Sequence, residues 1–307
     1  MQKVLYVGDI NVDVMMGGLA SFPVADKEIT CESFDVVMGS SAVIAACAYA
    51  ALGGNTAVCG LAGLDDHGDF MMKGLQEAGI DISLVQRTAE VGTGVTVNLI
   101  QDRIRTQVTY PGTIEAFDGA GLDRSALADV DHVHFAGPYL QTRFRPRVTY
   151  VLEIAKDLGA STSLDPQWDP TGRWEFMDEW LPLLSYLFVN EDEAMSITGS
   201  ESAAQACRSL GERTACPVVK TGKDGALVLD DDRIESRPPI DVEVVDTTGA
   251  GDNFDAGFLF AVLEKKMNRV EACEFGNAVA SRSCAFVGGT NAGSTYQDVM
   301  NLMETSR

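Results

Sequence analysis

Short apolar runs alternate along the chain with longer segments of helical character, a pattern typical of a parallel sheet whose strands are joined by crossover helices. Several of the helical segments end at glycines, as helix C-termini often do. The predicted strands are 4–7, 56–61, 132–136, 161–164, 186–189, 217–220, 226–229 and 242–245. The predicted helices are 40–52, 66–78, 147–158, 250–264 and 270–286, with a further acidic helix start at 191–193.

Two segments do not follow this alternation of strands and helices. Residues 95–99 and 104–110 alternate between apolar and polar positions on either side of a turn at 101–103, which predicts an antiparallel hairpin with one polar face. Residues 12–37 lack helical periodicity and predict further extended chain. We expect a small β-layer, from about 13–37 and 92–111, that covers a cleft at the carboxyl ends of the parallel strands. No linker or internal repeat interrupts 1–307, so we expect one domain with a lid.

Composition and charge narrow the range of partners. The 307 residues are 46% apolar and 22% charged, which is typical of a globular protein. The formal net charge is −22, from 23 Lys and Arg against 45 Asp and Glu. Proteins that bind nucleic acid or anionic lipid usually carry a basic face, so we expect neither partner.

Targeting signals are also missing from the pattern. No apolar run approaches the roughly 20 residues of a membrane helix, and residues 1–9 predict a strand in place of a secretory signal. The seven cysteines are scattered and include no Cys-x-x-Cys pair, which favours reduced thiols over disulfides or a zinc site. We therefore expect a cytoplasmic protein.

The strongest local motif is Asp-Thr-Thr-Gly-Ala-Gly-Asp at 246–252, between a predicted strand and a predicted helix. Glycines at a helix start leave backbone N–H groups available to an anion. An aspartate there would repel a stored phosphate, but it could take a proton from a hydroxyl that attacks phosphorus. The same residues also fit a glycine-rich turn with an ordinary aspartate at a helix N-terminus. The residues alone leave both interpretations open.

The motif at 246–252 resembles the C-terminal signature of the PfkB/ribokinase family of carbohydrate kinases. Further elements resemble that family in the same order along nearly the whole chain: 7–13, 39–53, 164–166, 190–193 and 221–225. The resemblance implies an α/β fold, the ribokinase-like three-layer sandwich with a central, mainly parallel sheet and a small β-sheet lid. Lid sheets of this kind pair between subunits in the family, so a homodimer through the lid is expected.

The resemblance also implies ATP-dependent phosphorylation of a small alcohol. Asp252 would be the general base, and the N–H groups of Gly249, Ala250 and Gly251 would form an anion hole. The implied substrate-binding residues are Asp13, Gly39, Ser40, Ile44 and Arg105. The implied nucleotide-side residues are Asn190, Thr221, Gly222, Gly225 and Asn277. Glu193, together with Asn190, would organise Mg²⁺, and Asp246 and Thr248 match positions that hold a monovalent cation such as K⁺ in many members.

The chain departs from the family pattern at the start of the helix predicted at 40–52. Ser40 replaces the second glycine of a Gly-Gly pair, and Ile44 replaces an asparagine that usually binds substrate hydroxyls. Because isoleucine neither donates nor accepts a hydrogen bond, a hydroxyl buried against it would lose roughly 1–3 kcal/mol. We expect a substrate that lacks a hydroxyl at this point or presents an apolar group there, whereas Ser40 either supplies a replacement hydrogen bond or caps the helix.

The motifs and their departures leave three hypotheses about the function. The leading hypothesis is a kinase for a small sugar or sugar acid; a nucleoside kinase of the same fold and a non-catalytic nucleotide- or sugar-binding regulator are the alternatives. Ile44 and the methionines near the lid would offer a nucleoside base an apolar surface, but Phe22, Phe34 and Tyr110 are too sparse for a stacking platform, which favours a sugar. The chain has no Gly-x-x-x-x-Gly-Lys-Ser/Thr motif and no Gly-x-Gly-x-x-Gly after the first strand, which disfavours P-loop and dinucleotide-binding enzymes.

Overall fold

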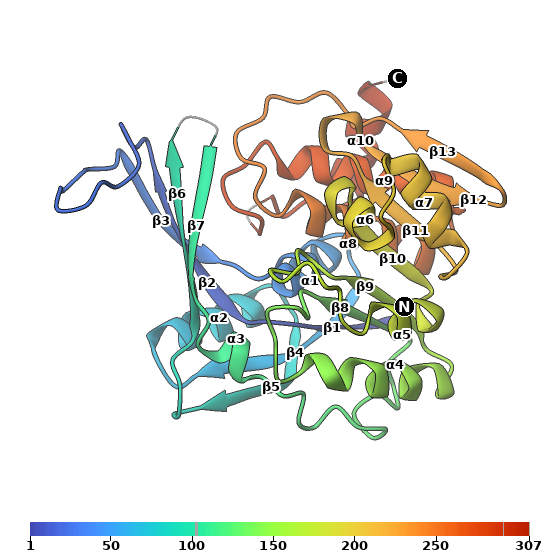
Figure 1. The fold of residues 1–307 in the computed structure, drawn as a ribbon, viewed down its shortest axis with the longest axis horizontal. Helices are drawn as coiled ribbons and strands as arrows, with labels where there is room; N and C mark the ends of the chain where they lie inside the picture. Colours follow the sequence, from blue (N-terminus) through green and yellow to red (C-terminus); the bar gives the residue numbers. More distant parts are fainter. Residues whose placement is uncertain (102–103, 291, 307) are drawn as a thin grey trace.

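A computed structural model describes residues 1–101, 104–290 and 292–306. Its main feature is a nine-stranded sheet in the order β13-β12-β11-β10-β9-β8-β1-β4-β5 (Figure 1). The strands are β1 (Lys3–Val7), β4 (Asn55–Gly63), β5 (Asp81–Thr88), β8 (His132–Ala136), β9 (Ser161–Asp165), β10 (Tyr186–Asn190), β11 (Pro217–Lys220), β12 (Ala226–Asp230) and β13 (Arg233–Arg237). From β5 to β11 all neighbours pair in parallel, and β12 and β13 form an antiparallel edge.

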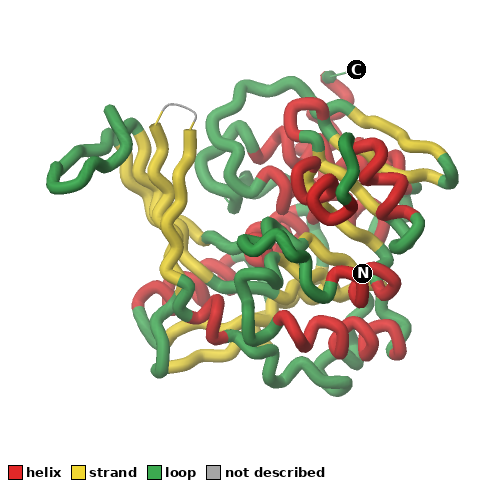
Figure 2. The backbone as a smooth tube through the Cα atoms, in the orientation of Figure 1, coloured by secondary structure: helices red, strands yellow, loops and turns green. Residues whose placement is uncertain are grey.

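Helices cover both faces of this sheet (Figure 2). They are α1 (Ser41–Ala51), α2 (Asp66–Glu77), α3 (Thr113–Ala116), α4 (Val148–Asp157), α5 (Met177–Trp180), α6 (Glu191–Thr198), α7 (Ala203–Gly211), α8 (Ala250–Leu263), α9 (Arg269–Ser283) and α10 (Tyr296–Thr305), with single 3₁₀ turns at Arg145–Arg147, Leu181–Leu183 and Gly222–Asp224. The predicted fold class, a three-layer α/β sandwich with a central, mainly parallel sheet, is confirmed.

Two apolar clusters show how the layers are held. On β1, Val4 and Tyr6 belong to the cluster that contains side chains of α1, α2, α8, α9 and α10. The alternate residues, Leu5 and Val7, belong to the cluster that contains side chains of α4, α5, α6 and α7. Because successive strand residues point to opposite faces, a continuous apolar strand such as β1 supports both layers.

A separate four-stranded sheet, in the order β3-β2-β6-β7, projects beside the carboxyl ends of the central strands (Figure 1). Its strands are β2 (Asn11–Gly17), β3 (Ser33–Met38), β6 (Gly94–Gln101) and β7 (Ile104–Tyr110). The predicted small β-layer is therefore confirmed, while part of the predicted turn at 101–103 lies outside the described residues.

The two faces of this small sheet differ in polarity. The register pairs Asp13 with Thr96 and Thr96 with Thr109, so these polar residues share one face. The register places Val14, Val36, Val97 and Val108 together on the opposite face. Near its free end that face is open, because Phe34 and Val108 are each 61% exposed.

Some predicted elements differ from the structure. The strand predicted at 242–245 is wrong: this stretch is a loop, and Val244 is 59% exposed. The backbone N–H of Val245 donates to the carbonyl of Cys284, at the end of α9, so this segment is held by a helix end and joins no strand. The sheet edge is formed by β13, whose sequence Arg-Ile-Glu-Ser-Arg carries little apolar signal. Strand β5 and helices α7 and α10 were not predicted.

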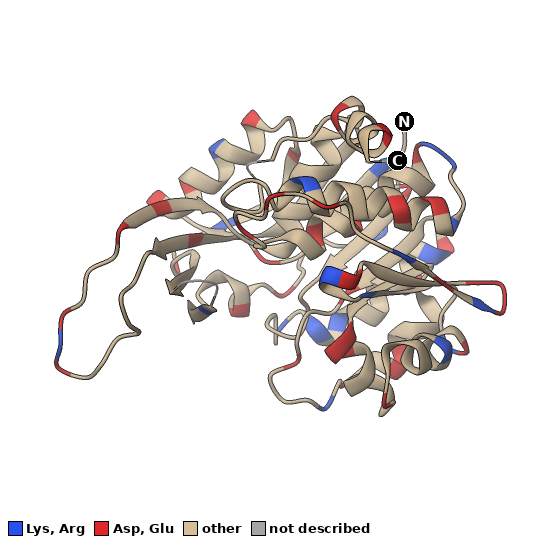
Figure 3. Cartoon of the chain, turned by 90° about the horizontal axis from the view of Figure 1, so that it is seen from above, with Lys and Arg blue, Asp and Glu red and all other residues tan. Residues whose placement is uncertain are grey.

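The surface and the cysteines agree with the composition. Acidic residues are spread over helices, strands and loops (Figure 3). All seven cysteines are free thiols, and five of them are buried. Within the described ranges, no helix combines the length and the apolar character needed to cross a bilayer.

Candidate active site

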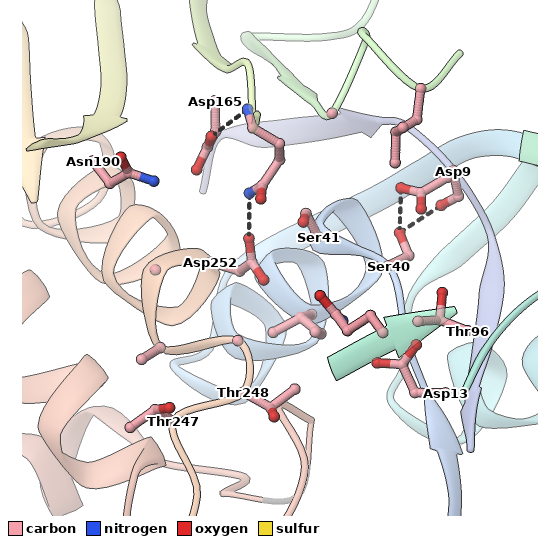
Figure 4. A pocket seen from close by; sticks show the side chains of 18 of the residues that line it. Asp9, Asp13, Ser40, Ser41, Thr96, Asp165, Asn190, Thr247, Thr248 and Asp252 are labelled. Carbon is pink, nitrogen blue, oxygen red and sulfur yellow. Dashed lines mark hydrogen bonds between the residues drawn. The ribbon is translucent and has the colours of Figure 1, made fainter. Parts of the chain in front are cut away.

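A cavity of about 460 Å³ lies between the carboxyl ends of the central strands, the N-terminal ends of α1 and α8, and the polar face of the small sheet (Figure 4). This volume suits a small molecule. Aside from glycines and Ala250, the apolar side chains on its wall are those of Ile44 and Leu140. The cavity is therefore built to hold a polar ligand.

Most of the site residues predicted from the sequence meet on this wall. They are Asp13, Ser40, Ile44, Arg105, Asn190, Glu193, Gly222, Thr248, Gly249, Ala250, Gly251 and Asp252. Gly39, Thr221, Gly225, Asp246 and Asn277 do not line it. The predicted residues thus come together from three strands (β2, β7 and β10), the starts of α1, α6 and α8, and two connecting segments that are far apart in the sequence.

Asp252 lies in the first turn of α8, which follows a left-handed residue at Gly249 (φ +72°). The side chain of Asp252 is only 7% exposed, and the amide of Gln167 donates to its Oδ1 at 3.4 Å. Burial, reinforced by the nearby carboxylate of Asp165, raises the pKa of Asp252 to about 7. A carboxylate with this pKa can both accept and release a proton near neutral pH.

The turn that begins α8 is tightly packed. A Cβ on Gly249 would lie 2.9 Å from Cγ2 of Ile44 and 2.9 Å from Cα of Gly289, so both its left-handed φ and the space require glycine. The first N–H groups of a helix have no partner within that helix, and here they stand at the cavity wall. The Ala250 N–H is engaged in a turn with the Thr247 carbonyl at 3.2 Å.

A buried cation stands beside this turn. Lys220 Nζ lies 2.6 Å from Asp165 Oδ2 and 3.1 Å from Asp255 Oδ1, and a Cβ on Gly251 would lie 3.1 Å from the same nitrogen. Burial opposes ionisation of Asp165, but the ammonium group lowers the pKa of this carboxyl below its usual range. Burial raises the pKa of Asp255 well above its usual range. We therefore interpret the cluster as an Asp165–Lys220 ion pair beside an Asp255 whose protonated form is favoured by burial.

Asn190 and Glu193 form a reciprocal cap at the start of α6. Asn190 Oδ1 accepts from the Glu193 N–H at 2.9 Å, and Glu193 Oε2 accepts from the Asn190 N–H at 2.8 Å. Burial and the charge of Asp165 raise the pKa of Glu193 to about 7. Across the part of the chain that the structure describes, no group of three or more His, Cys, Asp or Glu side chains could hold a metal on its own.

Asp13 stands on β2 at the opposite end of the cavity from Asn190. Asn11 Nδ2 donates to its Oδ1 at 3.1 Å. Gly39 comes so close that a Cβ would collide with this carboxylate, which explains the glycine at position 39 although it does not line the cavity. Burial, followed by the charge of Asp9, raises the pKa of Asp13 to about 6.

Arg105 connects the small sheet to the α8 turn. Its Nη1 donates to Thr248 Oγ1 at 2.8 Å. Thr248 in turn donates through its N–H and its hydroxyl to Asp246 Oδ1, at 2.9 and 2.8 Å. Asp246 Oδ2 accepts from the Gly288 N–H at 2.9 Å. Asp246 therefore holds the loop together from behind the cavity wall.

The remaining predicted residues lie in the turn at 221–225 or behind it. The Thr221 N–H donates to the Gly225 carbonyl at 2.8 Å, and a Cβ on Gly225 would collide with the Arg237 carbonyl. Asn277, only 4% exposed, donates to the carbonyls of Arg237 and Pro238 at 2.7 and 3.2 Å. Asn277 thus fixes the chain that leaves β13, and its amide nitrogen is already engaged there.

Several wall residues were not assigned roles from the sequence: Asp9, Asn11, Ser41, Thr96, Gln107, Thr109, Gln167 and Lys220. Asp9 and Asn11 follow β1, and Lys220 ends β11, so their position at carboxyl ends of parallel strands is a signal that could have found them. Gln167, two residues after β9, has the same signal, and it reaches Asp252 from a loop where its own φ is +53°.

Comparisons with known proteins place the chain in a family. The family model described as pfkB family carbohydrate kinase matches residues 1–295. An ATP-dependent ribose-1-phosphate kinase of Halopiger xanaduensis is 30% identical over 89% of this chain and 90% of its own length. A ribokinase of Haemophilus influenzae is 26% identical over 99% of both chains.

Solved structures agree as well. A putative ribokinase II of E. coli, in complex with ATP and Mg²⁺, superposes with a TM-score of 0.88 at 20% identity, covering 99% of this chain and 100% of the other. At that identity the superposition supports the fold, whereas the match of the family model over nearly the whole chain supports membership. This chain belongs to the pfkB family of carbohydrate kinases, whose members are ATP-dependent.

Proposed function

We propose that the chain transfers the γ-phosphoryl group of ATP to a hydroxyl of a small sugar or sugar acid. The observation that carries this proposal is the position of Asp252: a buried carboxylate in the first turn of α8, on the wall of a polar cavity that also contains Asp13. A base beside the positive end of a helix is suited to an acceptor hydroxyl that must approach a phosphoryl group.

The reaction then has one proton and one phosphoryl group to account for. The acceptor oxygen attacks the γ-phosphorus, the bond to the β–γ bridging oxygen breaks, and Asp252 takes the hydroxyl proton. The helix-start N–H groups of Gly249, Ala250 and Gly251 would stabilise charge on the transferring group. Since Ala250 N–H already donates to Thr247, Gly249 and Gly251 carry most of this role in our proposal.

The oxygen donors around Asn190 and Glu193 fit Mg²⁺. Mg²⁺ is usually held by one or two carboxylates, waters and substrate phosphates, so the lack of an all-protein cage among the described residues agrees with this ion. When bound, the ion would neutralise charge on the phosphate oxygens. Glu193 and the nearby Asp165 are the carboxylates we assign to it, directly or through water, and Thr221, Gly222 and Gly225 would border the nucleotide.

Potassium fits this arrangement less well. Three protein donors already occupy the carboxylate of Asp246, from Thr248 N–H, Thr248 Oγ1 and Gly288 N–H. About one lone pair of that carboxylate then remains for an ion. We therefore derive no step that depends on K⁺.

The cavity favours a sugar over a nucleoside. No aromatic side chain of the described residues lines it, so a base would find no stacking surface. At the acceptor end, Asp9, Asn11, Asp13 and Thr96 instead offer hydrogen-bond acceptors and donors for hydroxyl groups. Arg105 is the cation that would meet an acidic group of the substrate.

We also propose that the small sheet acts as a lid and as a dimer surface. The apolar face that carries Val36, Val97 and Val108 continues to exposed Phe34. An exposed apolar sheet face of this kind favours pairing with a second copy.

The test is ADP release from ATP and Mg²⁺ over a panel of sugars, sugar acids and nucleosides, with wild type and Asp252→Ala. We expect a sugar-dependent rate that falls about 10²–10⁴-fold in the variant, as for loss of a general base. If a nucleoside were phosphorylated far faster than any sugar, the sugar assignment would fail. ATP binding with no turnover of any compound would favour the non-catalytic regulator.

A further inference from the structure

Ser40 has a backbone conformation that only glycine adopts at low cost. Its φ is +74° and its ψ is 126°, it precedes α1, and it is almost fully buried at 7% exposure. A non-glycine residue in this region is strained, and such strain persists where the surrounding structure imposes it, often at a functional site. The contacts of the Ser40 hydroxyl therefore indicate why a strained serine stands at this position.

That hydroxyl joins the end of β1 to the start of α1. Ser40 Oγ lies 2.5 Å from the Asp9 carbonyl oxygen and 3.0 Å from Asp9 Oδ1, and it accepts from the Val43 N–H at 3.2 Å (Figure 4). Its single proton is shared between the two Asp9 oxygens. Since glycine would provide the same backbone without strain, what the serine adds is the cap on the Val43 N–H and the connection of α1 to both the carbonyl and the carboxylate of Asp9.

The carboxylate of Asp9 lies where it can accept a hydrogen bond from a ligand in the cavity. It is half-buried on the cavity wall, and its charge raises the pKa of both Asp13 and Asp252. Its Oδ2 makes no contact with the Ser40 hydroxyl, which approaches Oδ1. Nearby, Asn11 Oδ1 is buried without a hydrogen-bond partner among the described residues, so this end of the cavity also holds an acceptor that a ligand hydroxyl could satisfy.

Ile44 cannot satisfy a hydroxyl at this end. It is 4% exposed, and its side chain packs on Gly249 and Gly289 behind the α8 turn. A sugar hydroxyl that approaches α1 must find its partner elsewhere. The acceptors of Asp9 lie at the same helix start, on the β1 side.

We propose that Asp9, held by the strained Ser40, is a specificity-determining acceptor that binds one hydroxyl of the sugar, in place of the hydrogen bond that Ile44 cannot make. The inference rests on the proposed function. With Asp9 and Asp13 both at this end, the ligand presents two hydroxyl groups there, and a carboxylate or phosphate of the substrate lies away from them, toward Arg105. Ser40 is a positioning residue for Asp9.

The test compares Asp9→Asn, Ser40→Gly and the exposed control Asp129→Asn on the best sugar and its monodeoxy analogues. For one deoxy analogue, wild type loses about tenfold or more in kcat/KM, as expected for a hydrogen bond to a charged group. Asp9→Asn loses that discrimination and raises KM more than it lowers kcat. Ser40→Gly also raises KM, as Asp9→Asn does, while its Tm stays equal to that of wild type or rises. A serine with a merely structural role would not give this combination.

Calorimetric binding of the same sugars without ATP keeps the inference separate from turnover. If wild type binds a sugar and Asp9→Asn binds it at least tenfold more weakly, Asp9 is supported even when no phosphoryl transfer occurs. If Asp9→Asn keeps wild-type KM, deoxy discrimination and binding, the inference is overturned while the kinase activity stands. Wild type that binds none of the hydroxylated compounds also overturns it.

Discussion

Arg105 of β7 donates a hydrogen bond to Thr248 Oγ1, immediately before the helix cap Gly249, across 143 positions of sequence. It is a direct contact between the small sheet and the loop that precedes the proposed anion hole. Thr248 is itself held by Asp246, so the position of the small sheet is coupled to a rigid loop. We interpret the contact as the latch of a closed lid.

If this contact holds the lid closed, Arg105→Ala will let water reach the γ-phosphate. We expect ATP hydrolysis without sugar to rise relative to phosphoryl transfer, because lid closure excludes water. Thr248→Val should do the same, the double variant should add little, and Thr248→Ser should behave as wild type. Independent, additive effects of Arg105→Ala and Thr248→Val would contradict a shared latch.

The ion pair beside the α8 turn predicts unequal costs for two similar substitutions. Asp165→Asn leaves the buried Lys220 without a charged partner and should cost about 3–5 kcal/mol of unfolding free energy. Asp255→Asn replaces a neutral carboxyl by a neutral amide and should cost about 1 kcal/mol or less. Urea denaturation of the two variants measures both values. Equal costs would show that Asp255 is ionised, against our assignment.

The cap of α6 allows the charge of Glu193 to be removed without losing the helix start. Glutamine can accept the Asn190 N–H as glutamate does, so Glu193→Gln should keep the Tm of wild type. If Glu193 serves Mg²⁺, the concentration of Mg²⁺ that gives half-maximal rate should rise about tenfold or more. A titration of rate against Mg²⁺ at saturating ATP decides this, and an unchanged requirement would remove Glu193 from the ion.

The apolar face of the small sheet predicts a dimer. Val108→Glu places a charge on that face, so we expect dimeric wild type and a largely monomeric variant in sedimentation velocity. Val244→Glu, at an equally exposed valine of the loop before α8, should leave the oligomer unchanged. A monomeric wild type, or loss of the dimer in the Val244 variant alone, would argue against pairing through this face.

The sequence predicted most of the central strands because they are short, largely apolar runs. Residues 132–136 and 217–220 coincide with β8 and β11, since both strands are buried between helix layers. The apolar pattern did not predict the β13 edge of the central sheet correctly. β13 has few apolar residues, and 242–245 looked like a strand although no neighbouring strand is available to it. Pairing partners at an edge are set by tertiary structure, which local pattern does not contain.

The sequence predicted some residues of the candidate site and missed others. Residues inside a motif, such as Asp252 and Glu193, were found and do meet at the cavity. Lys220 was missed because a lysine at a strand end normally faces solvent, and only the tertiary fold brings Asp165 and Asp255 to it. Ile44 was predicted to face substrate and does line the cavity, but no feature of the sequence indicated that its side chain also packs against Gly249, 205 positions away.

The measurement that tests the central claim most directly is the pH dependence of kcat/KM in wild type, Asp252→Asn and Glu193→Gln. The pKa of Asp252, raised to about 7, means that the proton is bound below this pH and the base is then lost. We predict an acid limb near pH 7 that persists in Glu193→Gln, and a rate about 10²–10⁴-fold lower in Asp252→Asn. An Asp252→Asn variant with the wild-type rate and the same limb would contradict the assignment of Asp252 as the base.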